Sequence, residues 1–166
     1  ESPPTLDQVF EAMPPDFLIN VEMKVVIKGM RLIAQRVADT ICRHRRWEST
    51  LAASFNPMAL HHLRGFDPDI PLGYIWSHRH PYPVRCGWLR SLAGADWYDP
   101  APGGYGRNTH LKYRRAGKRL LVWDVDLGGD LKAMADAGVD GVVTDDLGPL
   151  VAQRRQARLL TPEASR

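Results

Sequence analysis

The residues best suited to chemistry lie in one short stretch, Phe17 to Lys24. Read as a β-strand, this stretch alternates, because successive side chains of a strand point to opposite faces. Three apolar residues then share one face: Ile19, Val21 and Met23. Three polar residues share the other: Asn20, Glu22 and Lys24. A carboxylate and an ammonium group two residues apart could form a metal ligand beside a contact for an anion. The structural alternative is a buried Glu–Lys ion pair.

The elements that follow this stretch favour the functional interpretation. A long helix is predicted over residues 29–46, because apolar residues recur there at helical spacing: Met30, Ile33, Ala34, Val37, Ala38 and Ile41. Further strand-then-helix units come after it. In such βα proteins the helices cover the sheet, so a polar row facing away from them points into a barrel lumen or a cleft. We therefore expect Glu22 and Lys24 to face an inner surface.

The rest of the chain reads as the same alternation of strands and helices. Strands are expected over residues 17–24, 49–55, 70–76, 95–98, 119–125 and 139–144, the fourth ended by Asp99-Pro100. Helices are expected over residues 5–13, 29–46, 58–64, 108–115, 130–137 and 147–159, with a helical turn at 88–92. Thr5 is expected to cap the first helix, and Gly65, Gly117 and Gly138 to end three others. The predicted class is α/β, with six strands in a single domain, residues 1–166.

Composition places few limits on function. The chain has 166 residues, 44% of them apolar and 25% charged, which is ordinary for a globular domain. Its net charge of +3 is too small to demand a nucleic-acid partner. No apolar run approaches the roughly 18 residues of a membrane span, we expect no signal peptide in this sequence, and the localisation is not readable from it. The chain begins Glu1-Ser2-Pro3-Pro4 without Met, so we expect it to be a processed or truncated part of a longer protein.

Several other clusters contain side chains that could form a site. The histidines of His78-Arg79-His80 could bind a metal or a phosphate, but this spacing is commoner in solvated loops. His61 and His62 are expected to be structural or neutral. Gly103-Gly104-Tyr105-Gly106 is not a phosphate loop, because no Lys-Ser/Thr follows it. Asp145 and Asp146 could bind a metal, but capping of the last helix is the favoured role. Cys42 and Cys86 have no metal-type spacing around them, and a disulfide between them stays open.

The arginine-rich helix ends suggest a binding module as a second class of function. They lie at residues 43–46, 114–115 and 154–155, where they could contact nucleic acid or acidic headgroups. Their scatter over three helices and the small net charge oppose this, so we expect no nucleic-acid partner. For Arg43 to Arg46, a structural role is expected, because cations are favoured near a helix C-terminus.

Five blocks, in order along almost the whole chain, resemble the glycerophosphodiester phosphodiesterase family. They are Pro4-Thr5-Leu6 with Asn20-Val21-Glu22-Met23-Lys24, Ser54-Phe55-Asn56-Pro57-Met58-Ala59-Leu60, Ile70-Pro71-Leu72-Gly73, Gly117-Lys118 with Val122-Trp123-Asp124-Val125-Asp126, and Gly138-Val139-Asp140-Gly141-Val142-Val143-Thr144-Asp145. The resemblance implies a (β/α)₈ barrel with its site at the C-terminal ends of the strands. It also implies metal-dependent hydrolysis of a glycerophosphodiester to glycerol 3-phosphate and an alcohol, with Mg²⁺ or Ca²⁺ as the cation.

The resemblance also assigns roles to four residues of this chain. Glu22 would be a metal ligand and Lys24 a contact to the substrate phosphate. Trp123 would line the pocket near the glycerol, and Phe55 would help to wall it.

The departures from the family pattern concern catalysis. Asp124 and Asp126 stand where the family usually has Thr and Asn; we expect the first to be neutral and the second to cap a helix. The family's earlier strands, which carry His-Arg-Gly, Glu-Asn-Thr, an acidic pair and a second His, have no counterpart, so no catalytic residue is assigned. We therefore expect barrel strands three to eight, inactive alone and prone to self-association through exposed sheet edges. The alternative is a degenerate barrel that binds a phosphate or a partner without catalysis.

Overall fold

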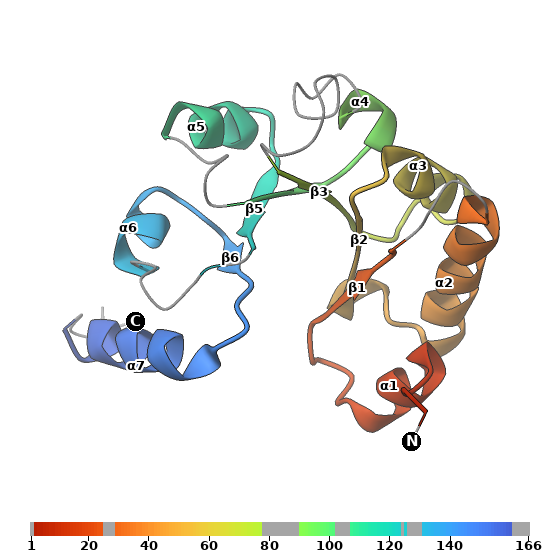
Figure 1. The fold of residues 1–166 in the computed structure, drawn as a ribbon, viewed down its shortest axis with the longest axis horizontal. Coiled ribbons are helices and arrows are strands. Elements are labelled where there is room, and N and C mark those ends of the chain that lie inside the picture. Colours follow the sequence, from red (N-terminus) through yellow and green to blue (C-terminus); the bar gives the residue numbers. More distant parts are fainter. Residues whose placement is uncertain are drawn as a thin grey trace. The chain divides into compact units, whose positions relative to one another are not determined.

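The computed structural model describes residues 2–24, 29–77, 90–101, 107–123, 125 and 131–160. The chain divides into two compact units, Glu1–Tyr98 and Asp99–Arg166, and the boundary falls inside one strand. Each unit is an α/β arrangement in which strands and helices alternate along the chain (Figure 1).

The first unit contains α1 (Leu6–Ala12), β1 (Ile19–Glu22), α2 (Met30–His44), the 3-10 turn η1 (Trp47–Ser49), β2 (Thr50–Ser54), α3 (Pro57–Phe66), β3 (Leu72–Trp76), α4 (Arg90–Ala93) and the beginning of β4 (Trp97–Pro100). The second unit contains the end of β4, α5 (Arg107–Arg115), β5 (Arg119–Val122), α6 (Leu131–Asp136), β6 (Gly141–Val142) and α7 (Leu147–Leu160). The six predicted strands are therefore all present.

The sheet of the first unit is parallel and follows the order of the chain. β1 pairs with β2 in parallel, with Glu22 opposite Ala53. β2 pairs with β3 in parallel, with Ala53 opposite Gly73. The main-chain N–H of Asp96 donates to Leu72 O at 2.9 Å, so the chain entering β4 runs beside β3. Parallel neighbours joined by helical crossovers are the βα pattern that the sequence predicts.

Helices α2 and α3 cover one face of this sheet (Figure 1). The centres of their apolar stripes are buried, as shown by Ala34 and Ile41 of α2 and by Leu60 and Leu63 of α3, each 0% exposed, whereas Ile33, predicted on the stripe of α2, is 38% exposed. The row Ile19 and Val21 of β1 is half-buried and Met23 is buried, whereas Asn20, Glu22 and Lys24 are exposed. The predicted alternation of β1 is therefore confirmed, with its polar row on the face away from the apolar core.

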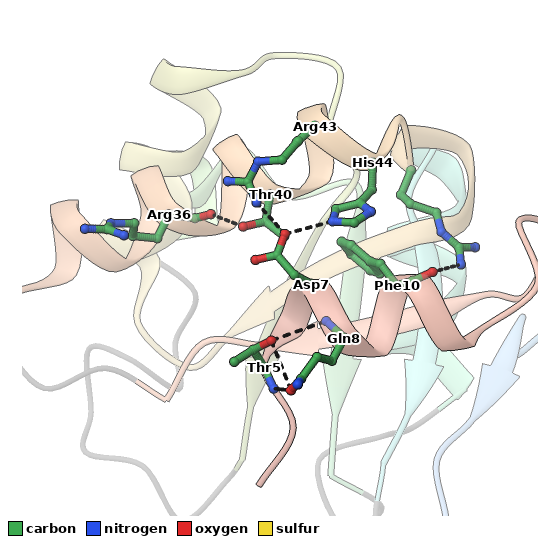
Figure 2. Close-up of polar contacts among 9 residues, drawn as sticks. Thr5, Asp7, Gln8, Phe10, Arg36, Thr40, Arg43 and His44 are labelled. Atoms are coloured by element: carbon green, nitrogen blue, oxygen red, sulfur yellow. Dashed lines mark hydrogen bonds and ion pairs between the residues drawn. The ribbon is translucent and has the colours of Figure 1, made fainter. Parts of the chain in front are cut away.

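Helix α1 is held on α2 by a cluster of polar contacts (Figure 2). Thr5 and Gln8 form a capping box at its start, with Gln8 Oε1 accepting from Thr5 N at 2.8 Å. The Asp7 carboxylate accepts from Arg43 and, at 2.8 Å, from His44 Nε2. Donation by His44 is the main reason that the pKa of Asp7 lies below its usual range, and Arg43 adds to it.

The guanidinium of Arg46, a residue only 5% exposed, closes the C-terminal end of α1. It donates to the main-chain oxygens of Phe10, Met13, Pro14 and Pro15, at 2.9, 2.5, 2.6 and 2.8 Å. The carbonyls that end a helix lack partners within it, and these bonds supply them. The structural role expected for Arg43 to Arg46 is supported at Arg43, His44 and Arg46.

The second unit pairs β5 with β6 in parallel, with Leu121 opposite Gly141. A Cβ at Gly141 would lie 2.9 Å from Leu121 Cδ1, so a larger residue there would require the Leu121 side chain to shift. Leu120 and Val122, on the other face of β5, are 0% exposed and form the core of this unit. Asp146 Oδ1 accepts from Gly148 N at 3.1 Å at the start of α7. The predicted capping of the last helix is therefore observed, and Asp146 provides it.

Many boundaries differ by one or more residues from the sequence-based prediction, and two of these differences change how a residue is placed. Gly65 was expected to end the third helix, but α3 continues to Phe66 and stops at Asp67. The reason is Pro68, because a residue that precedes proline is disfavoured in helical conformation. The fourth strand was expected at 95–98, but β4 spans Trp97–Pro100, so Asp99 lies inside it.

Several predicted features lie outside the described residues: His78-Arg79-His80, Cys86, Gly103 to Gly106, Asp124 and Asp126. Cys42 is exposed and free. Within the described ranges, none of the helices combines the length and the apolar character needed to cross a membrane.

Candidate functional site

Glu22 and Lys24 lie at the C-terminal end of β1, on its exposed face. Lys24 Nζ is 3.8 Å from Glu22 Oε2, and the two side chains are 82% and 31% exposed. The buried ion pair that the sequence left open as an alternative is therefore not what the structure shows. An exposed pair of this kind adds little to stability, because both charges stay in water. The two groups remain accessible to a ligand at the strand end, where βα proteins bind their ligands.

Two hydrogen bonds with residues of β2 hold the main chain of Met23, the residue between Glu22 and Lys24. The N–H of Met23 donates to Ala53 O at 2.7 Å, which extends the pairing beyond the last residue of β1. The hydroxyl of Ser54, which is 1% exposed, donates to Met23 O at 2.8 Å. Ser54 is a positioning residue that sequence reasoning did not single out, although it belongs to the block that carries the family resemblance.

Phe55 follows β2 and is half-buried. Because Glu22 is opposite Ala53, alternation places Phe55 on the same face as Lys24. The next residue, Asn56, begins α3: its Oδ1 accepts from Met58 N at 3.0 Å. Three of the four residues predicted for the site, Glu22, Lys24 and Phe55, thus share one face at the C-terminal ends of two neighbouring strands.

Trp123, the fourth predicted residue, belongs to the second unit and follows β5 directly. Its main-chain N–H donates to Pro100 O at 3.3 Å, and its indole Nε1 donates to Asp99 O at 2.8 Å. These two hydrogen bonds tie Trp123 to the C-terminal end of β4, and the residue is half-buried.

Asp99 is a further titratable residue at this strand end, and sequence reasoning missed it. It is 2% exposed, and neither carboxyl oxygen has a hydrogen-bond partner among the residues that the structure describes. Burial raises the pKa of Asp99 to about 7, because the charged form is poorly solvated in an apolar site. The sequence signal is an aspartate between Tyr98 and Pro100, but an Asp-Pro pair predicts the end of a strand, whereas Asp99 lies inside β4.

Glu22 is the metal ligand that the sequence predicts among the described residues. The Glu22 carboxylate is accessible, and hard divalent cations prefer such oxygen ligands. Across the described ranges, no group of three or more His, Cys, Asp or Glu side chains comes together. Glu22 therefore fits the role of one ligand, and the remaining ligands are not found among these residues.

Residues 1–148 match the glycerophosphoryl diester phosphodiesterase family. This chain belongs to that family. The match confirms the resemblance found in the sequence, and it covers all four predicted site residues. The family generally depends on a divalent cation.

A curated relative, the glycerophosphodiester phosphodiesterase of Caldanaerobacter subterraneus subsp. tengcongensis, is 29% identical over 155 residues. The aligned part is 89% of this chain and 60% of the relative. The chain therefore spans about three-fifths of the length of this family member.

Solved structures of family members share the fold. A phosphodiesterase of Oleispira antarctica, in complex with the product sn-glycerol-3-phosphate, is 21% identical with a TM-score of 0.74, covering 95% of this chain and 62% of that one. The glycerophosphodiester phosphodiesterase of Agrobacterium tumefaciens C58 is 18% identical with a TM-score of 0.66, covering 90% and 61%. The predicted fold class, an α/β fold of the (β/α)₈ barrel type, is confirmed.

Proposed function

We propose that the full-length protein hydrolyses a glycerophosphodiester to glycerol 3-phosphate and an alcohol. The observation that carries this proposal is the pair Glu22 and Lys24, exposed 3.8 Å apart at the C-terminal end of β1, in a chain of the glycerophosphodiester phosphodiesterase family. The product named for the relative from Oleispira antarctica is consistent with the proposed reaction.

Glu22 is proposed as a ligand of the divalent cation, Mg²⁺ or Ca²⁺. A bound cation of this kind supplies Lewis-acid chemistry, which polarises a phosphoryl oxygen. The role suits Glu22, because its carboxylate is accessible and its main chain is fixed by the Met23–Ala53 hydrogen bond.

Lys24 is proposed to contact the substrate phosphate. Its ammonium group lies on the same face as Glu22 and is 82% exposed, so it can pair with an anionic oxygen in place of the carboxylate. A fixed positive charge near the phosphate stabilises the charge that develops in the transition state. Phe55, on the same face, and Trp123, in the second unit, are proposed as apolar walls for the glycerol part of the substrate.

No residue of this chain is proposed as the proton carrier. The histidine-bearing blocks of the family have no counterpart in this sequence, and the chain spans about three-fifths of its curated relative. We therefore propose that strands outside these 166 residues complete the site, and that the chain alone is inactive.

A Glu22→Gln variant of the full-length protein tests this function. We expect Mg²⁺- or Ca²⁺-dependent hydrolysis of glycerophosphocholine to fall at least about 100-fold, because an amide replaces a charged ligand, while the melting temperature stays unchanged. Glu48→Gln is the matched control, since Glu48 is exposed in η1 just before β2, at the opposite end of the sheet. Normal turnover by Glu22→Gln would remove Glu22 from the site.

The second candidate is a barrel that binds a phosphate without catalysis. Among the described residues, no three His, Cys, Asp or Glu side chains come together, which favours this candidate, because Glu22 as one ligand holds a metal weakly. Binding of glycerol 3-phosphate that depends on Lys24, without hydrolysis of any glycerophosphodiester by the full-length protein, would support this candidate over the enzyme.

A further inference from the structure

Asp99 carries a carboxyl group that the proposed reaction does not use. The residue is only 2% exposed, and within the described part of the chain neither carboxyl oxygen has a hydrogen-bond partner. A buried polar group without a partner is costly, and native proteins contain few of them. An orphaned carboxyl at the C-terminal end of a barrel strand therefore calls for a second state in which it gains a partner.

The register of the second unit places Trp123 beside this carboxyl. The N–H of Trp123 donates to Pro100 O, so Trp123 pairs next to Ala101, and alternation puts Asp99 and Trp123 on the same face of the sheet. The indole also reaches back along β4, because Nε1 donates to Asp99 O at 2.8 Å. The indole N–H is thus already bound to the residue that holds the orphaned group.

Asp99 therefore has two kinds of hydrogen-bond acceptor, its main-chain oxygen and its carboxyl oxygens, for one donor, the indole N–H of Trp123. Its main-chain oxygen holds the indole N–H, and its carboxyl oxygens belong to the same residue. A protonated carboxyl is a poor competitor, whereas a carboxylate accepts a charge-assisted hydrogen bond roughly twice as strong as a neutral one. Exchange of the main-chain oxygen for the carboxylate as acceptor requires the Trp123 side chain to rotate.

We propose that Asp99 is a positioning residue for Trp123: when its carboxyl ionises, the carboxylate takes the indole N–H from the Asp99 main-chain oxygen and turns the ring. The statement that this ring borders the substrate rests on the proposed function. The coupling between the two residues rests on the hydrogen bond and the register alone.

Burial is the physical cause that raises the pKa of Asp99 to about 7, and the groups that face its carboxyl are uncharged. On this face, β5 presents Leu121 and Trp123, and β6 presents Gly141 and Val143, all uncharged. Arg119 shares the face but is exposed at the other end of β5. None of the charged side chains described on α5, α6, α7 or the β6 entry, including Asp140, contributes to the shift. The rotation is therefore expected near neutral pH.

The test is a fluorescence titration of Trp123 in the protein. The signal is the emission of the unaltered protein minus that of Trp123→Phe, followed from about pH 5 to about pH 9, a range that brackets the expected midpoint. We expect a transition near pH 7, its loss in Asp99→Asn and in the apolar variant Asp99→Leu, and its retention in Asp145→Asn. Asp145 is the matched control because it is an exposed aspartate of the same unit.

Two results would overturn the proposal. One is a Trp123-dependent signal that stays flat across this range, a result that requires no Asp99 variant to fold. The other is a transition that persists unchanged in Asp99→Asn or Asp99→Leu. A purely structural role for Asp99 would lower the melting temperature of these variants without producing a Trp123 transition to lose.

A second measurement separates this inference from the proposed function. In the full-length protein, we expect KM for glycerophosphocholine to change across neutral pH, and this change to disappear in Asp99→Asn. If no hydrolysis is found at any pH but the Asp99-dependent fluorescence transition is present, the proposed function fails and the coupling stands. If hydrolysis is found without that transition, the coupling fails and the function stands.

Discussion

At the scale of single residues, Glu22 and Lys24 show why function and stability can be tested separately. Their ion pair is exposed, so its contribution to the free energy of unfolding is at most about 1 kcal/mol. The strand that carries them is instead held by buried contacts, such as the hydroxyl of Ser54 on Met23 O. A substitution at Glu22 or Lys24 can therefore remove a ligand contact and leave the fold intact.

Asp99 gives a pH dependence of stability whose sign is fixed by its raised pKa. The folded protein holds this proton up to a pKa of about 7, whereas the unfolded chain releases it near 3.8. Between these values the folded state binds more protons, so the free energy of unfolding falls as pH rises. The loss amounts to at most about 4 kcal/mol by pH 8, since one pKa unit is about 1.4 kcal/mol. Urea unfolding at pH 4 and pH 8 should show this loss in the unaltered protein and not in Asp99→Asn.

The control for this measurement is again Asp145→Asn, which removes an exposed carboxylate from the same unit. It should follow the unaltered protein at both pH values. An Asp99→Asn variant that loses as much stability as the unaltered protein between pH 4 and pH 8 would show that Asp99 is ionised and solvated in the folded state.

The sequence was sufficient to predict the polar face of β1, but it did not reveal that the carboxyl of Asp99 is buried. The reason for this difference is physical. Alternation within Phe17 to Lys24 is a local property, and it places Glu22 and Lys24 on one face without knowledge of the rest of the fold. The burial of Asp99 depends on pairing with residues near Trp123, which lie more than twenty positions later. An Asp-Pro pair reads as a strand end, and only the neighbouring strand shows that β4 continues through it.

At the scale of elements, helix ends show the same division between local and tertiary causes. Thr5 and Gln8 fix the start of α1 through a local capping box, which the sequence allows one to expect at Thr5. The basic end of α2 was attributed to the helix dipole, but its main partners are the Asp7 carboxylate and the carbonyls at the end of α1. A charge pattern can indicate a structural role without identifying the partner.

The glycine inside α3 leads to a stability prediction. Gly65 has no left-handed backbone conformation, and a Cβ built there meets nothing within 4 Å. Alanine should therefore fit without strain and reduce the entropy lost on folding, which stabilises a helix interior by roughly 0.5–1 kcal/mol. We expect Gly65→Ala to raise the melting temperature by about 1–4 °C in a thermal unfolding scan.

Gly94 is the matched control for this substitution, because it lies in the same unit and has φ +59°. Its added Cβ would also find space, with Arg64 Nε at 4.0 Å, so backbone strain is the main difference between the two sites. Gly94→Ala should lower the melting temperature, since a left-handed conformation costs a non-glycine residue about 1–2 kcal/mol. A fall in melting temperature for Gly65→Ala would indicate that the end of α3 needs the glycine.

At the scale of the whole molecule, the order of elements was predictable and the complete site was not. Six strands with intervening helices follow from hydrophobic periodicity and from turn residues, and the solved family structures share this fold. A barrel site, in contrast, collects one or two side chains from each of several strands. This chain contributes Glu22, Lys24, Phe55 and Trp123 to the proposal, and its match to family members covers about three-fifths of their length.

The isolated 166-residue chain should therefore fail as a catalyst and associate with itself. Losing a positioned acid or base alone costs about 10²–10⁴ in rate, and Glu22 as a single carboxylate should hold a metal weakly. In the order of the described strands, β1 stands at one end beside β2 and β6 at the other beside β5, and exposed strand edges pair with other chains. We expect no hydrolysis of glycerophosphocholine with Mg²⁺ or Ca²⁺, and a mass above that of the monomer in light scattering. A monomeric chain with robust turnover would contradict this prediction and direct the search for a proton carrier to His78, His80 and His110.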